Sequence, residues 1–149
     1  MKFANKVVVA VGLSSEMFEM LQPLRDMDFL TKSEIHFVHA FSTINYTSVL
    51  SDFPLIYPVQ ADRKAIEESV LALLAKCSHD ILPKDFSGKI IQKCLFSDTP
   101  KEAFSDYVKE NNADLVIVPT RQKRGLFESS FAQYVNKHTE ATMIFLKQS

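Results

Sequence analysis

Short apolar runs alternate along the chain with longer segments in which apolar residues return every three or four positions. The short runs are rich in branched aliphatic residues, which is typical of strands buried on both faces of a parallel sheet. The most apolar of them is the four-residue run 115–118. Five strands are therefore predicted, at 6–11, 34–41, 89–96, 113–118 and 142–146.

The segments between these runs predict four helices. A serine, Ser14 or Ser15, is the candidate cap of the first helix, and Pro23 should kink or divide it. The second helix is predicted over about 59–79. Its expected core stripe is Ile66, Val70, Leu73, Leu74 and Cys77.

The third helix has the clearest start signal. Thr99 suits the cap position, Pro100 the first helical position, and Glu102 completes a capping box. Asn111 and Asn112 are expected to end this helix. The fourth helix is marked by Phe127, Phe131, Tyr134, Val135 and His138.

This alternating order is typical of an α/β protein with a doubly wound parallel sheet. The chain shows no repeat, linker or low-complexity tract, so residues 1–149 are expected to form a single domain. Ligands bind such sheets beyond the carboxyl ends of the strands, which directs attention to the basic segment after the fourth strand. The segment from Ser42 to Pro58 is long for a connection, and it is either a lid or partner-binding segment or an irregular crossover.

Composition narrows the classes of function. A net charge of −1 argues against a dedicated nucleic-acid binder. No apolar run approaches the ~18 residues of a membrane span, and no signal peptide precedes the first strand, so a cytoplasmic protein that does not enter membranes is expected. Cys77 and Cys94 form no CxxC pair, which favours two buried thiols over a zinc or redox site.

Candidate catalytic and metal-binding groups are few. His36 and His39 are expected on one face of the second strand, and they lack a cysteine or carboxylate at the spacing of a zinc site. No Gly-x-Ser-x-Gly elbow, phosphate loop or dinucleotide fingerprint is present. A receiver domain shares the order of elements, but Gly12 and Ser97 stand near the places of its acidic residues. We therefore expect neither an enzyme nor a metal site.

Several motifs resemble those of the universal stress proteins, over essentially the whole chain. The run 113–118 is very close to the Ala-Asp-Leu-Ile-Val-Met strand of that family, and Asp98-Thr99-Pro100 is similar to the Gly-x-Pro before its third helix. Other matching segments are the first strand to Ser14, Val38-His39-Ala40, Thr120-Arg121, Gly125-Leu126 and the final strand. The resemblance implies a three-layer, Rossmann-like sandwich with a five-stranded parallel sheet in the order 3-2-1-4-5. It also implies a homodimer paired through the C-terminal strand, Thr142 to Lys147.

The phosphate-binding motif of that family is degenerate here. Its ATP-binding members carry Gly-x-x-Gly, nine further residues, then Gly and Ser or Thr, so that backbone amides and a hydroxyl hold the phosphates. The matching positions are Pro119, Gln122, Ala132 and Gln133, and the first-strand aspartate and adenine-side valine are replaced by Gly12 and Ala40. Pro119 has no amide hydrogen to donate. The resemblance therefore implies a member that has lost the ATP site, and no cofactor is expected.

The remaining crevice supplies the candidate ligand-binding residues. The candidates are Ala10, Val11, Gly12, Ala40, Val118, Pro119, Thr120, Arg121, Lys123, Arg124, Ala132 and Gln133. The three basic residues among them either hold an anion or form a solvated loop. We expect a stress-response protein that acts on an unidentified protein partner by interaction or regulation. The alternative is a sensor that binds ATP, or another nucleotide or anion, through a remodelled phosphate loop.

Overall fold

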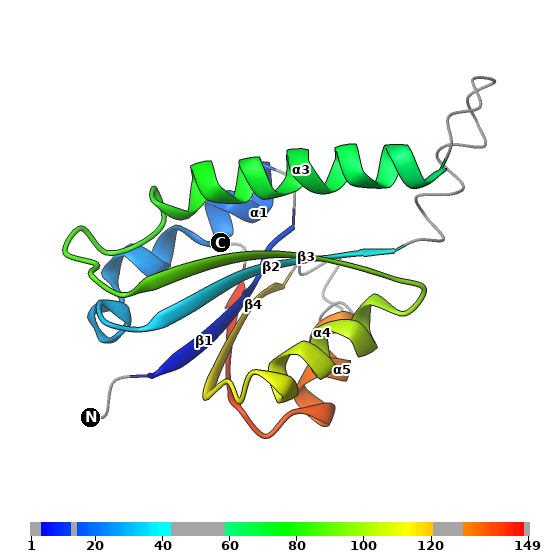
Figure 1. The fold of residues 1–149 in the computed structure, drawn as a ribbon. Coiled ribbons are helices and arrows are strands. Elements are labelled where there is room, and N and C mark those ends of the chain that lie inside the picture. The colour runs from blue at the N-terminus through cyan, green and yellow to red at the C-terminus, as the bar shows by residue number, and fades with distance from the viewer. Residues whose placement is uncertain (1–3, 13–14, 43–58, 121–129, 148–149) are drawn as a thin grey trace.

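A computed structural model describes residues 4–12, 15–42, 59–120 and 130–147 of the chain. The elements follow the alternating order predicted from the sequence (Figure 1). The strands are β1 (Lys6–Ala10), β2 (Glu34–Ser42), β3 (Lys89–Ser97), β4 (Leu115–Thr120) and β5 (Thr142–Lys147). The helices are α1 (Ser15–Met20), α3 (Val59–Ser78), α4 (Pro100–Glu110) and α5 (Ser130–His138), with short 3₁₀ helices at Gln22–Asp26 and Asp28–Leu30.

The five strands form one parallel sheet in the order β3-β2-β1-β4-β5, which confirms the predicted fold class and strand order. Strand β1 is central: Val9 pairs in register with Phe37 of β2 on one side and Ile117 of β4 on the other. Figure 1 shows α1 and α3 over one face of the sheet and α4 and α5 over the opposite face. The molecule is therefore the expected three-layer sandwich.

Two apolar cores form, one on each face of the sheet, because side chains alternate along a strand. Val9 and Phe37 pack on the α3 side with Leu74, and Val8 packs on the α4 side with Phe104. Each of these five side chains is at most 1% exposed. The apolar runs of the sequence thus become strands covered on both faces, as predicted.

Helix α3 buries a stripe that differs from the predicted one at one position. Val70 and Leu74 are 5% and 1% exposed, as expected. The prediction for Leu73 is wrong, since this side chain is 37% exposed while Leu71 packs partly buried against the core. Successive helical residues lie about 100° apart, and Ser78, which is 1% exposed, places the centre of the buried stripe on the Leu71 side of Val70 and Leu74, away from Leu73.

Two helix boundaries confirm the sequence signals. Helix α1 ends at Met20, and Pro23 lies in the following 3₁₀ helix, so the proline divides the first helical segment. Helix α4 ends before Asn111, and Asn112 takes a left-handed backbone with φ 52°. Asparagine tolerates this conformation better than most residues and suits the end of a helix.

The predicted capping box at the start of α4 does not form. Thr99 holds the cap position, but its side chain makes no capping hydrogen bond. Its hydroxyl lies 3.3 Å from the Ser97 hydroxyl, which also accepts the Thr99 backbone N–H at 3.0 Å. Ser97 at the end of β3 therefore competes successfully for the local hydrogen bonds.

The two histidines of β2 lie on opposite faces of the sheet, so the expectation of one shared face is wrong. His36 contacts Tyr107 of α4, with its Nδ1 atom 2.6 Å from the tyrosine hydroxyl. His39 lies on the other side, and its Nδ1 atom donates to the Val11 carbonyl at 2.7 Å. Residues three apart in a strand point to opposite faces because the side-chain period is two.

Two further predictions concern segments away from the sheet. Apart from Ser42, which ends β2, the predicted lid or crossover from Ser42 to Pro58 lies outside the described residues. Among the helices that the structure describes, none is long and apolar enough to cross a membrane.

Candidate functional site

The carboxyl ends of β1, β2 and β4 surround a small pocket, which we call the strand-end pocket. Its volume is about 220 Å³. Its lining residues are Ala10, Val11, Gly12, Met17, Val38, His39, Ala40, Val118, Pro119 and Phe131. Strands β2 and β3 lie on one side of β1, and β4 and β5 lie on the other, so the direction of strand addition reverses at β1. Parallel α/β sheets bind their ligands outside the carboxyl ends of the strands at such a switch point.

Half of the predicted site residues meet in the strand-end pocket. Those that line it are Ala10, Val11, Gly12, Ala40, Val118 and Pro119. Thr120 is buried, with its hydroxyl donating to the Leu146 carbonyl at 3.4 Å, and Ala132 is fully buried in the core beside α5. Gln133 is exposed and does not line the pocket. Arg121, Lys123 and Arg124 lie outside the described residues.

Four lining residues were not among the predicted site residues: Met17, Val38, His39 and Phe131. Val38 and Phe131 belong to apolar stretches whose pattern predicts core, and periodicity does not separate a pocket wall from a core position. The sequence gives a weak indication that Met17 is a lining residue, since it is the first apolar residue after the predicted helix cap that follows β1. The first turn of a helix that directly follows a strand lies close to the carboxyl end of that strand.

The lining of the strand-end pocket is apolar. None of the side chains that the structure describes around it is an acid, a lysine or an arginine. Burial lowers the pKa of His39 below 6.5, and the hydrogen bond that its ring donates to the Val11 carbonyl opposes this shift. His39 is therefore neutral at pH 7. Pro119 adds no backbone N–H, so the described walls offer no positive group to a phosphate.

Gly12 lies directly beneath the Met17 side chain. A Cβ atom at position 12 would be 2.8 Å from Cγ of Met17 and 3.0 Å from its Cε. Carbon atoms do not approach this closely, so a larger residue at position 12 requires Met17 to move. Met17 thus occupies the space in which a longer side chain at the end of β1 would stand.

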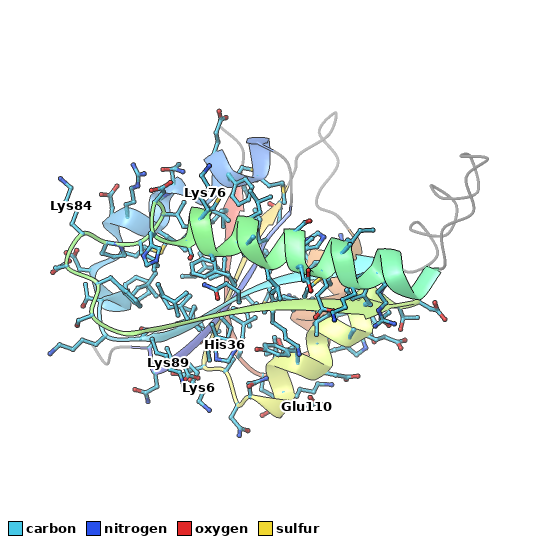
Figure 2. The ribbon with its side chains drawn as sticks, turned by 45° about the horizontal axis from the view of Figure 1, so that its top comes forward. Lys6, His36, Lys76, Lys84, Lys89 and Glu110 are labelled. Atoms are coloured by element: carbon cyan, nitrogen blue, oxygen red, sulfur yellow. The ribbon has the colours of Figure 1, made fainter. Side chains whose placement is uncertain are left out.

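A second polar cluster lies between the sheet and α4. The Nε2 atom of His36 is 2.8 Å from Oε2 of Glu34, and Nδ1 is 2.6 Å from the Tyr107 hydroxyl. Glu34 pairs in register with Lys6 of β1 and Lys89 of β3, and Figure 2 shows these two lysines with His36. We call Glu34, His36 and Tyr107 the α4 bracket.

The protonation of the α4 bracket follows from its neighbours. The hydrogen bond to His36 and the charges of His36, Lys6 and Lys89 lower the pKa of Glu34 against a desolvation that raises it, so the carboxylate is ionised at neutral pH. In the tautomer that donates from Nε2 to Glu34, Nδ1 of His36 accepts the Tyr107 hydroxyl. Burial and the Glu34 charge raise the pKa of Tyr107, so this hydroxyl stays protonated. The bracket joins α4 to β2, and none of its three residues lines the strand-end pocket.

Two larger hollows lie at the opposite, amino ends of the strands. One, of about 890 Å³, is bounded by the last residues of α4 and α5, and the other, of about 910 Å³, lies beyond the end of α3. Both are lined by charged residues of both signs. In the part of the chain that the structure describes, no three His, Cys, Asp or Glu side chains come together as metal ligands. The strand-end pocket therefore remains the candidate site.

Comparison with known proteins gives a family and a set of structures. A model described as the Universal stress protein family matches residues 4–147. No curated protein matches the sequence significantly.

The similar solved structures share the fold at low sequence identity. One is a hypothetical protein whose biochemical function was assigned from its structure: TM-score 0.75, 13% identity, covering 99% of this chain and 98% of that one. Another is a universal stress protein from Archaeoglobus fulgidus, with TM-score 0.64, 16% identity and coverage of 96% and 93%. A third is a universal stress protein in complex with cAMP, with TM-score 0.64, 15% identity and coverage of 99% and 100%.

Proposed function

The chain belongs to the universal stress protein family, and we propose that it acts in the stress response through protein interaction or regulation, without catalysis and without binding ATP in the family manner. The family match covers residues 4–147, nearly the whole chain. The observation that carries the proposal is the chemistry of the strand-end pocket. Its described walls are apolar and enclose about 220 Å³, below the roughly 300–1,000 Å³ of typical ligand pockets.

A triphosphate needs hydrogen-bond donors and positive charge, because moving an anion out of water without partners is costly. Pro119 stands at the position of the first glycine of the resembling motif and lies buried in β4, in register with Leu146. It therefore supplies no amide. Ala132 stands at the position of the third glycine and is fully buried in the core. These two residues support a crevice that no longer holds phosphates in the family manner.

The absence of catalysis is supported by the state of the α4 bracket. Its three polar groups are hydrogen-bonded in the order of a nucleophile, a base and an orienting acid, but none of them lines the strand-end pocket. The raised pKa of Tyr107 opposes formation of a nucleophilic phenolate. The bracket thus has the features of a structural connection.

The nucleotide content of the purified protein tests this proposal. The protein is purified without added nucleotide, denatured, and its released small molecules are examined by ultraviolet absorbance and mass spectrometry. An ATP-binding relative prepared in the same way is the control. We expect no stoichiometric nucleotide, and one adenine nucleotide per chain would contradict the proposal.

We also propose a homodimer through β5. This strand is at one end of the sheet, so one side of its backbone has no strand partner within the described chain. Open strand edges recruit other chains, and antiparallel pairing of two copies around a two-fold axis would satisfy the backbone groups. Met143 and Phe145 are half-buried on the α4 and α5 side and would gain further burial, worth roughly 1.5–3 kcal/mol for each side chain that becomes fully covered.

Sedimentation of the wild-type chain and two lysine variants tests the dimer. Met143→Lys introduces a charge at the β5 edge, and Ile91→Lys is the control on the opposite edge strand, also half-buried on the α4 side. We expect a dimer for the wild type and for Ile91→Lys, and a folded 16.9 kDa monomer for Met143→Lys. A wild-type monomer at tens of micromolar would overturn the proposed dimer.

A nucleotide- or anion-binding sensor is the second candidate function. It is favoured by the universal stress protein whose crystal structure contains cAMP and by the basic residues Arg121, Lys123 and Arg124. Melting curves with cAMP or phosphate, at ionic strength held constant with chloride, distinguish the candidates. A ligand-dependent rise in melting temperature would favour the sensor by mass action.

We further propose a cytoplasmic location. Cys77 and Cys94 are both free thiols, which is typical of proteins in a reducing compartment. Fractionation of cells that produce the tagged protein tests this, and recovery outside the cytoplasmic fraction would contradict it.

A further inference from the structure

The wall of the strand-end pocket formed by Met17 differs from the others. The remaining lining residues belong to β2, β4, α5 and β1 with the two residues that follow it, whereas Met17 reaches the pocket from the first turn of α1. It is unbranched, with three rotatable bonds, and so adapts its shape more easily than the β-branched residues around it. Its Cγ and Cε atoms occupy the space above Gly12, where even one added carbon would be 2.8 Å away.

The chemistry of the pocket favours a ring without charge. Among the described residues that line the pocket, no side chain is ionised at neutral pH, since His39 is held neutral by burial. A charged ligand would lose its hydration without compensation. Phe131 and the imidazole of His39 offer edges and faces to an aromatic ring, and the Met17 sulfur makes favourable contacts with such rings.

The volume limits the ligand to a small molecule. A cavity of roughly 150 Å³ lined by apolar side chains holds benzene, and pockets for drug-sized ligands begin at roughly 300 Å³. At about 220 Å³, the strand-end pocket has room for one substituted ring but not for a nucleoside. Removing the Met17 side chain beyond Cβ would join the space above Gly12 to the pocket.

We propose that the strand-end pocket binds a small, uncharged molecule with one aromatic ring, and that Met17 is the residue that excludes larger ligands from it. This inference rests on the proposed function, because it assumes a crevice that no longer holds ATP. Met17 acts as a specificity-determining wall, and its flexibility sets the upper size of the ligand.

The test uses full-length protein labelled with ¹³C at the methionine methyl groups, titrated with benzyl alcohol and separately with adenosine. The chain has five methionines, and the Met17 signal is identified by its loss in Met17→Leu. We expect benzyl alcohol to shift the Met17 signal and to leave that of Met20 unchanged, since Met20 is buried on the same helix and does not line the pocket. Equal shifts of the two signals would overturn the proposal.

Three variants test the role of Met17 in exclusion. Met17→Ala is expected to bind adenosine at least tenfold more tightly than the wild type. Met20→Ala is the matched control, and Met17→Leu retains a wall, so both should bind adenosine as weakly as the wild type. Urea unfolding verifies that each variant is folded; should Met17→Ala not fold, the titration of the wild type with benzyl alcohol still decides the proposal.

The outcomes separate this inference from the proposed function. Adenosine binding that is equal in the wild type and Met17→Ala overturns the role of Met17. An adenine nucleotide that copurifies with the wild type contradicts the proposed function, whereas a nucleotide-free wild type whose Met17 signal does not respond to benzyl alcohol overturns this inference alone.

Discussion

Removal of the Tyr107 hydroxyl tests whether the α4 bracket holds α4 against the sheet. Tyr107→Phe keeps the ring, which meets His36 edge-on with centroids 5.6 Å apart, and removes only the oxygen 2.6 Å from Nδ1 of His36. The His36 side chain is 4% exposed, so water does not readily replace the lost donor. The substitution therefore leaves a buried acceptor without a partner.

The expected loss of stability follows from that unsatisfied acceptor. A buried polar group that loses its partner costs about 1–3 kcal/mol. For a chain of this length, each kcal/mol lowers the melting temperature by about 2–4 °C. A loss of about 2 kcal/mol thus corresponds to a decrease of about 4–8 °C in the melting temperature.

Urea and thermal unfolding of Tyr107→Phe measure this loss. Tyr134→Phe is the control, because Tyr134 stacks on His138 with its ring and its hydroxyl makes no hydrogen bond among the described residues. We expect the control to lie within about 0.5 kcal/mol of the wild type. Equal stabilities for the two phenylalanine variants would refute the role given to the α4 bracket.

Three further predictions concern other close contacts in the structure. In Gly88→Ala the added Cβ would be 2.0 Å from the Ser33 carbonyl oxygen, so the backbone must shift, and the urea midpoint should fall by an amount equivalent to about 1–3 kcal/mol with an unchanged slope. Asp114→Ala removes a carboxylate that accepts two backbone N–H groups of the N-terminal segment, at 2.5 and 3.3 Å; a loss of about 1–2 kcal/mol and faster hydrogen exchange at those two amides are expected. Because the pKa of His39 is lowered in the folded state, the unfolded chain binds more protons as the pH falls below 6.5, and stability should decrease more steeply for the wild type than for His39→Gln between pH 7 and 5.5. Parallel pH profiles would contradict this assignment.

The sheet was predictable because its signal is local. Each apolar run is flanked by polar or turn residues, and the run 115–118 became β4, the strand with every residue buried. The strand order was available only through the family resemblance, since periodicity does not say which strands are neighbours. The predicted strands agreed with the observed bounds to within two residues, whereas Phe127 of the predicted fourth helix lies outside the described residues.

The pocket wall was less predictable because it depends on how separate segments return to the sheet. Met17 and Phe131 lie 114 positions apart in the sequence, and both reach the pocket only after α1 and α5 have packed on opposite faces. The capping box at Thr99 failed for a different reason: a nearby serine in β3 offered a competing hydrogen bond. Sequence patterns describe preferences of single segments, and such competition is decided by the packed structure.

Calorimetric titration of the full chain with Mg-ATP measures whether the crevice at the ends of β1, β2 and β4 has lost the binding of ATP. Pro119, Gly12 beneath Met17 and the apolar lining predict a dissociation constant no tighter than about 1 mM, or roughly −4 kcal/mol. The titration should therefore show only heats of dilution at micromolar ATP. A saturable isotherm with a micromolar dissociation constant would show that the crevice still binds ATP.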